Sequence, residues 1–200
     1  MMGGREAFTE NLDALFNEPL GKPKYQFYGQ LPDQTGNVGQ FSMGNEPSFH
    51  IPYLYNYAGH PWKTQKRIRH LMRQWFRNDL MGIPGDEYGC PMSAFVVFSC
   101  MGFYPVTPGL PVYNIGSPVF DEITIHLSGR NDFIIEAGNN SPHNKYIQSA
   151  TFNGSPLNKP WFVPEKMMEG GTLMLKMGPK ANKQWGSEKK AAPPSFNLSK

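Results

Sequence analysis

The sequence predicts an α+β fold, with helices in residues 1–105 and strands in residues 106–179. In the first part, apolar residues recur every three to four positions, which is typical of helices that bury one face. In the second part, apolar and polar residues alternate, as they do in the strands of a half-buried sheet. The 21 glycines and 19 prolines among 200 residues indicate many short elements joined by turns.

The first two helices are predicted from apolar spacing and from the residues at their ends. One occupies residues 5–17 and ends before Pro19. Its apolar face comprises Phe8, Leu12, Leu15 and Phe16. The second begins in the string Asn45-Glu46-Pro47-Ser48, which offers a capping residue and a proline suited to a first turn. We expect it to continue through residues 50–57.

A third and longer helix begins at Pro61 and is the most clearly amphipathic of the chain. Its apolar face comprises Ile68, Leu71, Met72, Trp75 and Phe76. The basic residues between positions 63 and 77 fall mostly off that face, which indicates a solvated surface. Phosphate binding is the weaker alternative, because no aromatic side chains interleave with these basic residues.

Residues 92–103 are apolar nearly all round, so we expect a helix after Pro91 that is buried on most of its faces. Such a helix needs neighbours on every side. The three other predicted helices are too few to surround it, and this deficit requires an explanation.

Four short strands follow, bounded by turn residues. They are expected at residues 123–127, 133–135, 146–152 and 172–177. Asn153-Gly154 is the strongest hairpin signal in the chain. The close spacing of these strands predicts a small antiparallel sheet or sandwich. Residues 180–200 are rich in Lys, Ala, Pro and Ser, and we expect an extended basic tail there.

Composition excludes several classes of function. The net charge is +3, but the tail from residue 180 onward carries five lysines against one glutamate, which leaves −1 for residues 1–179. We therefore expect no nucleic-acid partner. No apolar run approaches the roughly 18 residues that span a bilayer, and the first ten residues lack the apolar stretch of a signal peptide, so we expect no membrane partner. The two cysteines are too few for a disulfide scaffold.

Two polar clusters interrupt the apolar pattern, and both are candidates for carrying chemistry. One is Gly44-Asn45-Glu46-Pro47-Ser48 with His50, and the other is Gly85-Asp86-Glu87-Tyr88. Each lies in a glycine-bearing loop just ahead of a helix, where backbone N–H groups hold carboxylates well. Loops at one end of a helical layer would bring Glu46 close to Asp86 or Glu87 as paired acids.

Ordinary structural roles compete with this interpretation. Asn45 and Asp86 have the residue types that cap helices. Glu46 and Glu87 have the type and position of first-turn acids that complement a helix dipole. From residue types alone, both the structural and the catalytic roles stay open.

Longer strings carry more information. The segment 44–57 reads GNEPSFHIPYLYNY, and the segment 82–87 reads GIPGDE. With these, the segments 61–65, 92–95, 102–106, 113–118, 144–149 and 153–154 closely resemble the α-mannosidases of glycoside hydrolase family 92. The resemblance covers roughly residues 25–186.

This resemblance implies a large, usually exported enzyme that cleaves α-mannosides with inversion and needs Ca²⁺. Members of the family combine an N-terminal β-sandwich with an (α/α)6 barrel. The chain resembles the C-terminal portion, namely the last barrel helices (1–105) and the β segment after them (106–179). The rest of the barrel would then supply the missing neighbours of residues 92–103. A periplasmic or secreted location is implied, although no signal peptide is visible in this chain.

The resemblance also implies roles for the two polar clusters. Asn45, Glu46 and His50 match a motif that lines the mannose and Ca²⁺ pocket, with Asn45 as the candidate Ca²⁺ ligand. The family's catalytic loop usually reads Gly-Asp-Glu-Asp-Gly-Gly-Gly-Met. Here Asp86 and Glu87 match it, but Tyr88 replaces the second aspartate, to which we assign the role of general base.

Inversion needs a general acid and a general base about 6.5–9.5 Å apart. The family's acid lies in an upstream motif that this chain does not contain, and a phenol with a reference pKa near 10 is a poor substitute for a carboxylate base. We therefore expect a fragment of, or a homologue to, a Ca²⁺-dependent inverting exo-α-mannosidase that acts on α-mannoside glycans and is inactive alone. Its partner would be the missing N-terminal part of the enzyme. A non-catalytic carbohydrate-binding or scaffold module on the β segment, or a truncated product without a role, are the alternatives.

Overall fold

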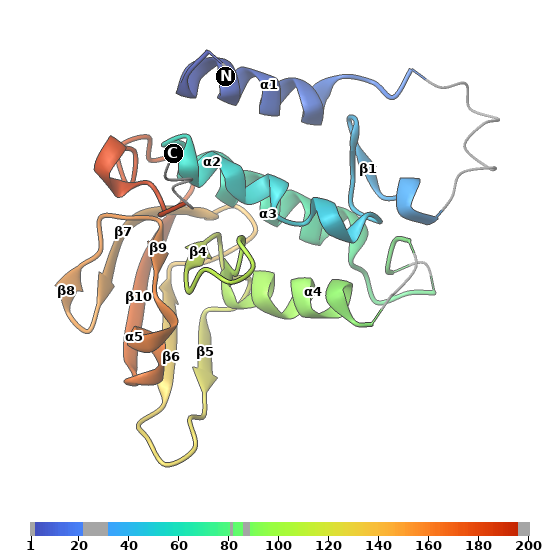
Figure 1. Cartoon of the computed structure of the whole chain (residues 1–200). Coiled ribbons are helices and arrows are strands. Elements are labelled where there is room, and N and C mark those ends of the chain that lie inside the picture. The colour runs from blue at the N-terminus through green and yellow to red at the C-terminus, as the bar shows by residue number, and fades with distance from the viewer. Residues whose placement is uncertain (1–2, 22–31, 81, 86–88, 196–200) are drawn as a thin grey trace.

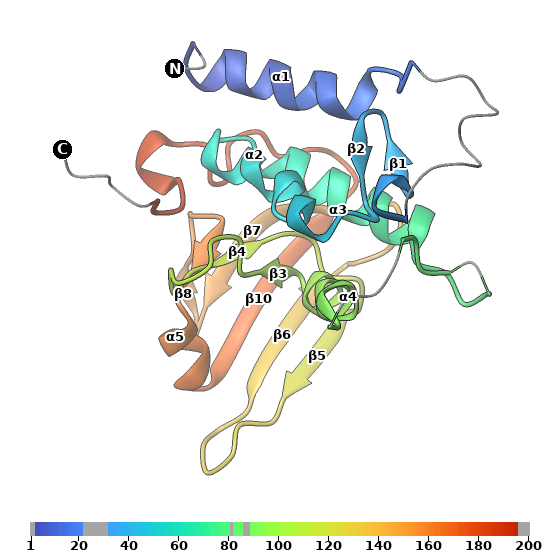
Figure 2. The same cartoon turned by 45° about the vertical axis from the view of Figure 1, so that its right-hand side comes forward.

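The structure is a computed structural model that describes residues 3–21, 32–80, 82–85 and 89–195 (Figure 1). Helices dominate the N-terminal half and strands the C-terminal half, which confirms the α+β class. Figures 1 and 2 show the helices α1, α2 and α3 stacked on one side of the main sheet, with α4 beside the sheet. No helix among the described residues has the length and apolar character needed to cross a membrane.

Three of the four predicted helices form as expected. They are α1 (Arg5–Asn17), α3 (Pro61–Trp75) and α4 (Pro91–Met101). Prolines at the first positions of α3 and α4 fit there because a first-turn N–H has no partner within the helix. The residue after α1, Glu18, is already extended, as expected of a residue that precedes a proline.

The prediction of one helix over residues 50–57 is wrong. Three short helical turns replace it: η3 (Glu46–Ser48), η4 (Ile51–Tyr53) and α2 (Leu54–Tyr57). Pro47 and Pro52 each lack an N–H, and a proline inside a helix clashes with the preceding turn. The chain therefore restarts a helical turn at each proline.

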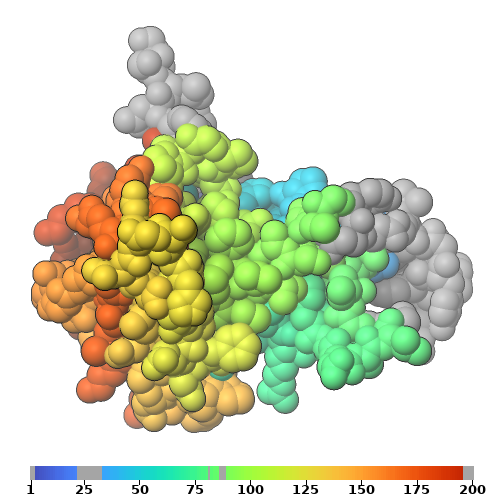
Figure 3. All heavy atoms as spheres, turned by 90° about the horizontal axis from the view of Figure 1, so that it is seen from below, coloured from blue at the N-terminus to red at the C-terminus, as the bar shows by residue number. Residues whose placement is uncertain are grey.

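The helices enclose a first hydrophobic core. Its largest fully buried side chains include Phe41, Phe49, Tyr53, Tyr55, Ile68, Leu71, Met92 and Phe95. α4 contributes Met92, Phe95 and Ser99 to the interior, but Val97 on its opposite side is 56% exposed. Figure 3 shows α4 at the surface, between the strands and the C-terminal end of α3. Within the described residues, α4 is thus buried on one side rather than on most of its faces.

A five-stranded sheet forms the other layer, in the order β5-β6-β10-β7-β8. Its strands are β5 (Glu122–Ile125), β6 (Phe133–Gly138), β7 (Tyr146–Phe152), β8 (Ser155–Pro156) and β10 (Gly171–Gly178). The sheet is mixed rather than wholly antiparallel, because β10 pairs in parallel with β6 and antiparallel with β7. The chain reaches β10 after β8, β9 (Trp161–Phe162) and α5 (Pro164–Met168), and β10 then inserts between two earlier strands.

Smaller elements complete the layers. β3 (Phe103–Tyr104) and β4 (Tyr113–Ile115) join β9 in a three-stranded sheet, and β1 (Asn37–Val38) pairs with β2 (Phe41–Ser42) after the turn η2 (Pro32–Gln34). Asn153 and Gly154 both have positive φ, at 48° and 77°, and connect β7 to β8. The predicted hairpin is therefore confirmed, since two residues of positive φ match the twist of the strands they join.

Buried polar side chains connect the helical layer to the sheets. The Asn56 amide nitrogen donates to the carbonyl oxygens of Ile115 and Pro160 at 3.0 and 3.3 Å, and to the Asn114 side chain at 3.3 Å. The Gln65 side chain accepts a hydrogen bond from the backbone N–H of Ile147 at 3.0 Å. Unpaired groups at such depth are costly, so these bonds fix how the two layers meet.

The segment after β10, which we expected to be an extended tail, has little regular structure but packs closely on the body as far as it is described. It contains the short turn η5 (Lys189–Ala191). Trp185 is buried, and its indole N–H donates to the Leu157 carbonyl at 2.8 Å. Asn182 donates to the Gln148 carbonyl at 2.8 Å.

Candidate functional site

The first polar cluster lies directly after β2, where the chain enters η3. Asn45 occupies the N-cap position of η3, but its side chain makes no capping bond to the backbone. Its amide nitrogen donates instead to the Ser48 hydroxyl at 2.6 Å. The amide oxygen, a good ligand for hard cations and sugar hydroxyls, is not used in this contact.

Glu46 is half-buried, and its Oε1 atom is buried without a hydrogen-bond partner among the described residues. A buried carboxylate oxygen is costly unless a donor or a cation faces it. η3 is only three residues long, so its dipole is small. The alternative role of Glu46, as an acid that complements a helix dipole, is therefore weakly supported. The Glu46 carboxylate is therefore suited to a ligand.

His50 closes the cluster. Its Nδ1 lies 2.9 Å from the Pro47 carbonyl oxygen. Because a carbonyl oxygen only accepts, the proton of this hydrogen bond sits on Nδ1. In the neutral imidazole, Nε2 is then an acceptor available to a hydroxyl group.

The second polar cluster begins in contact with the first. A Cβ added at Gly85 would lie 2.8 Å from the Cα and 2.9 Å from the carbonyl oxygen of Gly44. Pro84 similarly lies against Gly36, next to the loop that carries β1 and β2. The two loops predicted to meet therefore do meet, up to Gly85. Asp86, Glu87 and Tyr88, the predicted catalytic residues, lie outside the described residues.

The end of the second loop leads into α4 through Gly89 and Cys90, both in the left-handed region at φ 67° and 68°. Left-handed backbone strongly favours glycine. The backbone at Cys90 therefore has the conformation that a glycine would take. Pro91 is accommodated as the first residue of α4.

A polar cavity of about 350 Å³ opens beside Asn45. Its lining comprises Leu20, Asp33, Gln34, Asn37, Gln40, Ser42 and Asn45. The Asn37 side-chain oxygen is buried without a partner among the described residues, as is Glu46 Oε1. Amides, a hydroxyl and a carboxylate are the groups that bind sugar hydroxyls. Apart from Asn45, sequence reasoning missed these residues, because they are spread over 26 positions and form no motif.

The residues present fit a calcium ion in part. Among the described residues, no group of three or more His, Cys, Asp or Glu side chains could hold a metal. Ca²⁺, however, takes amide and carbonyl oxygens as readily as carboxylates. The unpartnered Glu46 oxygen and the neighbouring Asn45 amide oxygen are ligands of that kind.

Comparison with known proteins identifies the family. The family model described as the glycosyl hydrolase family 92 catalytic domain matches residues 1–179. The chain belongs to glycoside hydrolase family 92. The resemblance inferred from the motif strings is confirmed, and the two loops that meet at Gly44 and Gly85 lie within the matched region.

Solved structures of family 92 share the fold of this chain. A family 92 α-mannosidase from Bacteroides thetaiotaomicron, in complex with mannoimidazole, is 36% identical, with a TM-score of 0.88 over 98% of the chain. A family 92 inverting mannosidase from Bacteroides thetaiotaomicron VPI-5482 is 38% identical, with a TM-score of 0.83 over 97% of the chain. An uncharacterised secreted glycosidase from Arthroderma benhamiae is 32% identical over 199 residues.

The match is unequal in length. The chain spans 25% and 27% of the two family 92 mannosidases and 23% of the secreted glycosidase. Nearly all of this chain thus corresponds to about a quarter of each relative.

Proposed function

We propose that the chain is the C-terminal part of an inverting exo-α-mannosidase and supplies one wall of the pocket that binds a terminal mannose. The contact between Gly44 and Gly85 carries this proposal, because it joins the two loops that hold the family's polar motifs. Asn45, Glu46 and His50 would bind the sugar from the first loop. Asp86 would orient water or a sugar hydroxyl from the second.

On its own, this chain would not catalyse hydrolysis. Inversion requires a carboxylic acid to protonate the leaving oxygen and a carboxylate on the opposite side to activate water. Tyr88 occupies the position that we assign to the base, and Glu87 beside it does not replace it in the family pattern. The acid would come from the portion of the enzyme that this chain does not match. We therefore propose that turnover needs both that portion and a carboxylate at position 88.

Ca²⁺ would be held by the Glu46 carboxylate and the Asn45 amide oxygen, with further oxygens from outside this chain, since Ca²⁺ prefers about 6–8 ligands. When bound, the ion would supply positive charge for sugar hydroxyls and the developing transition state. The unpartnered Glu46 oxygen supports this assignment. We further propose that the substrates are α-mannoside glycans and that the protein is exported, as the secreted relative is described.

A hybrid enzyme tests the proposal. In it, this whole chain replaces the matching quarter of the 36% identical Bacteroides thetaiotaomicron α-mannosidase. We expect no turnover of an aryl α-mannoside, with Ca²⁺ present, by the chain alone. Tyr88→Asp should raise the kcat of the hybrid by about 10²–10⁴-fold, the range for general-base catalysis. Tyr88→Phe is the matched control and should stay inactive.

Clear turnover by the chain alone would refute the claim that it is inactive. A folded Tyr88→Asp hybrid without turnover would refute the assignment of the base. Mannose titration of the same hybrid distinguishes the alternative carbohydrate-binding module. Under our proposal, Glu46→Ala abolishes Ca²⁺-dependent binding, whereas binding that survives this change would point to a separate site on the sheet.

A further inference from the structure

Most of the basic side chains between positions 63 and 77, in α3 and just after it, have partners within the chain. Lys63 pairs with Asp13, and the Arg67 guanidinium lies 4.5 Å from the centre of the Phe16 ring. Arg69 donates to three acceptors: the Pro118 carbonyl oxygen, the Asn140 side-chain oxygen at 3.1 Å and the Ser141 carbonyl oxygen at 2.8 Å. Arg77 pairs with Asp79 at 3.2 Å. These contacts account for four of the six cations predicted as a solvated face.

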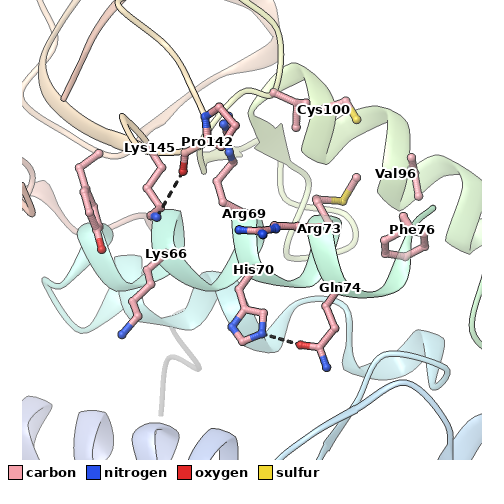
Figure 4. A pocket seen from close by; sticks show the side chains of 13 residues that line it. Lys66, Arg69, His70, Arg73, Gln74, Phe76, Val96, Cys100, Pro142 and Lys145 are labelled. Atoms are coloured by element: carbon pink, nitrogen blue, oxygen red, sulfur yellow. Dashed lines mark hydrogen bonds between the residues drawn. The ribbon is translucent and has the colours of Figure 1, made fainter. Parts of the chain in front are cut away.

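The other two, Lys66 and Arg73, are exposed and form no ion pair with any described residue. Both line a cavity of about 730 Å³ between α3, α4 and the loop that leads into β7 (Figure 4). Lys145, on that loop, also lines it; its Nζ donates to the Pro142 carbonyl at 3.4 Å and lies 5.7 Å from the centre of the Tyr146 ring, with no ion pair to any described residue. No carboxylate is among the described residues that line the cavity, so these residues present unpaired positive charge.

The inner surface of this cavity is apolar. It includes Met72, Phe76, Val96, Cys100 and Val119. Figure 4 shows Val96 and Cys100 on α4 and Phe76 close to Val96, whereas the Lys66 side chain points away from α4. Such a lining is poorly suited to a small hydrated anion, which binds through many N–H donors. It suits a segment with one apolar face and acidic residues at the edges of that face.

Apolar surface also continues outside the cavity. Val97, on α4 next to the lining residue Val96, is 56% exposed, and Phe120, next to the lining residue Val119, is also 56% exposed. The backbone N–H of Val119 donates to the Cys100 carbonyl at 3.0 Å, which holds the Phe120 loop against the end of α4. Large exposed apolar side chains that adjoin a cavity are typical of a surface covered by another polypeptide.

We propose that this cavity is the docking surface for an amphipathic helix that carries carboxylates and belongs to the part of the family 92 enzyme outside this chain. The proposal rests on the proposed function, because it assumes that the chain works with the remaining three quarters of such an enzyme. The apolar face of the incoming helix would cover Val96 and Val97. Its carboxylates would pair with Lys66, Arg73 and Lys145.

Alkylation of Cys100 by iodoacetamide tests the docking surface, since Cys100 lines the cavity and is half-buried. The rate at this residue is followed by peptide mapping in the chain alone and in the hybrid described above. We expect the hybrid to react at least about tenfold more slowly, as for a site that must open before it reacts. Lys66→Glu combined with Arg73→Glu should remove most of this protection, measured as the ratio of the rates in the chain alone and in the hybrid with both carrying the substitutions, because the changed charge also affects the Cys100 thiolate directly. Lys176→Glu with Lys180→Glu, on exposed lysines outside the cavity, is the matched control and should retain it.

The outcomes separate the two proposals. If the Tyr88→Asp hybrid hydrolyses the mannoside but its Cys100 reacts as fast as in the chain alone, the docking surface is refuted and the proposed function stands. Protection that survives the double charge reversal refutes the carboxylate partner. Slowing of alkylation in the chain alone by millimolar inorganic phosphate would assign the cavity to small anions and overturn the proposal. A Tyr88→Asp hybrid that does not hydrolyse the mannoside, although its Cys100 is still protected, refutes the proposed function and leaves the docking surface standing.

Discussion

The backbone of Gly85 rests on the backbone of Gly44, so closely that a methyl group on Gly85 would approach the Gly44 Cα to 2.8 Å. Two loops separated by 40 residues thereby share one surface. Because the motif residues Asn45 and Glu46 follow Gly44 directly, this contact sets how near they lie to the start of the acidic loop. It is the feature of the site that substitution can test most directly.

Gly85→Ala should separate the two loops, and Gly89→Ala is its natural control. Both glycines have positive φ, at 74° and 67°, so each alanine costs roughly 1–2 kcal/mol of backbone strain. A methyl group at Gly89 meets nothing within 4 Å, whereas at Gly85 it meets the Gly44 backbone. We expect Gly85→Ala to lower the free energy of unfolding by about 1–3 kcal/mol more than Gly89→Ala does. Urea unfolding measures both, and equal losses would contradict the contact.

Tyr53 should make stability fall in alkaline solution. It is fully buried, and burial raises the pKa of its phenol far above the usual range. The folded chain therefore holds this proton longer than the unfolded chain does. Its contribution is complete below about pH 10 and declines above it by about 1.4 kcal/mol per pH unit.

Tyr53→Phe should remove the contribution of Tyr53 to the fall in unfolding free energy with pH. Urea unfolding between about pH 9 and about pH 11 measures this fall. The hydroxyl groups of Tyr53 and Ser99 lie 3.2 Å apart and form a hydrogen bond. Ser99→Ala removes this hydrogen bond, as Tyr53→Phe does, but keeps the phenol. Both variants should lose about 1 kcal/mol at neutral pH. Only the tyrosine variant should flatten the alkaline slope, and an unchanged slope in that variant would refute the assignment.

Asp13 should anchor α1 to the rest of the helical layer. Its carboxylate accepts a hydrogen bond from the Tyr55 hydroxyl at 2.9 Å and pairs with Lys63 of α3. We expect Asp13→Ala to cost about 1–2 kcal/mol, because it leaves the Tyr55 hydroxyl without its acceptor. Glu10→Ala, on an exposed position of the same helix, should change stability by less than about 0.5 kcal/mol. Hydrogen exchange should show faster exchange in α1 for the first variant only.

Asn56 should be essential for joining the helices to the sheets. Its amide donates to three acceptors that belong to or flank the three-stranded sheet. Asn56→Ala removes the donor to the Ile115 carbonyl and to the Asn114 side chain. The Pro160 carbonyl keeps the Ile115 N–H as a donor at 2.8 Å, and we expect a loss of about 2–3 kcal/mol. Asn158→Ala, at an exposed position, is the control and should be nearly neutral. A small effect of Asn56→Ala in thermal unfolding would show that the hydrogen bonds of Asn56 are not essential for joining the layers.

The sequence predicted those parts of the fold that local physics determines. α1, α3 and α4 follow from apolar periodicity and from prolines that fit a first turn. The turn at Asn153-Gly154 follows from two residue types that tolerate positive φ. The same reasoning failed over residues 50–57, where Pro52 interrupted an apolar pattern that otherwise favoured one helix.

Pairing between distant strands left no local signal. The alternation in residues 172–177 predicted a strand but not its place between β6 and β7, nor its parallel pairing with β6. The burial of Trp185 was missed for a similar reason, since its neighbours in sequence are polar and its partner Leu157 is 28 residues away. In the site, motif strings indicated Asn45, Glu46 and His50, whereas the polar cavity beside them arises only from the fold.

The position of β10 in the sheet also determines when β6 and β7 can pair fully during synthesis. β6 and β7 are made early, but each must keep one edge unpaired until residues 171–178 leave the ribosome and fill the gap between them. Exposed strand edges are prone to pair with other chains. A nascent chain stalled before residue 171 would therefore carry two open edges, and β10 is the strand that brings them together.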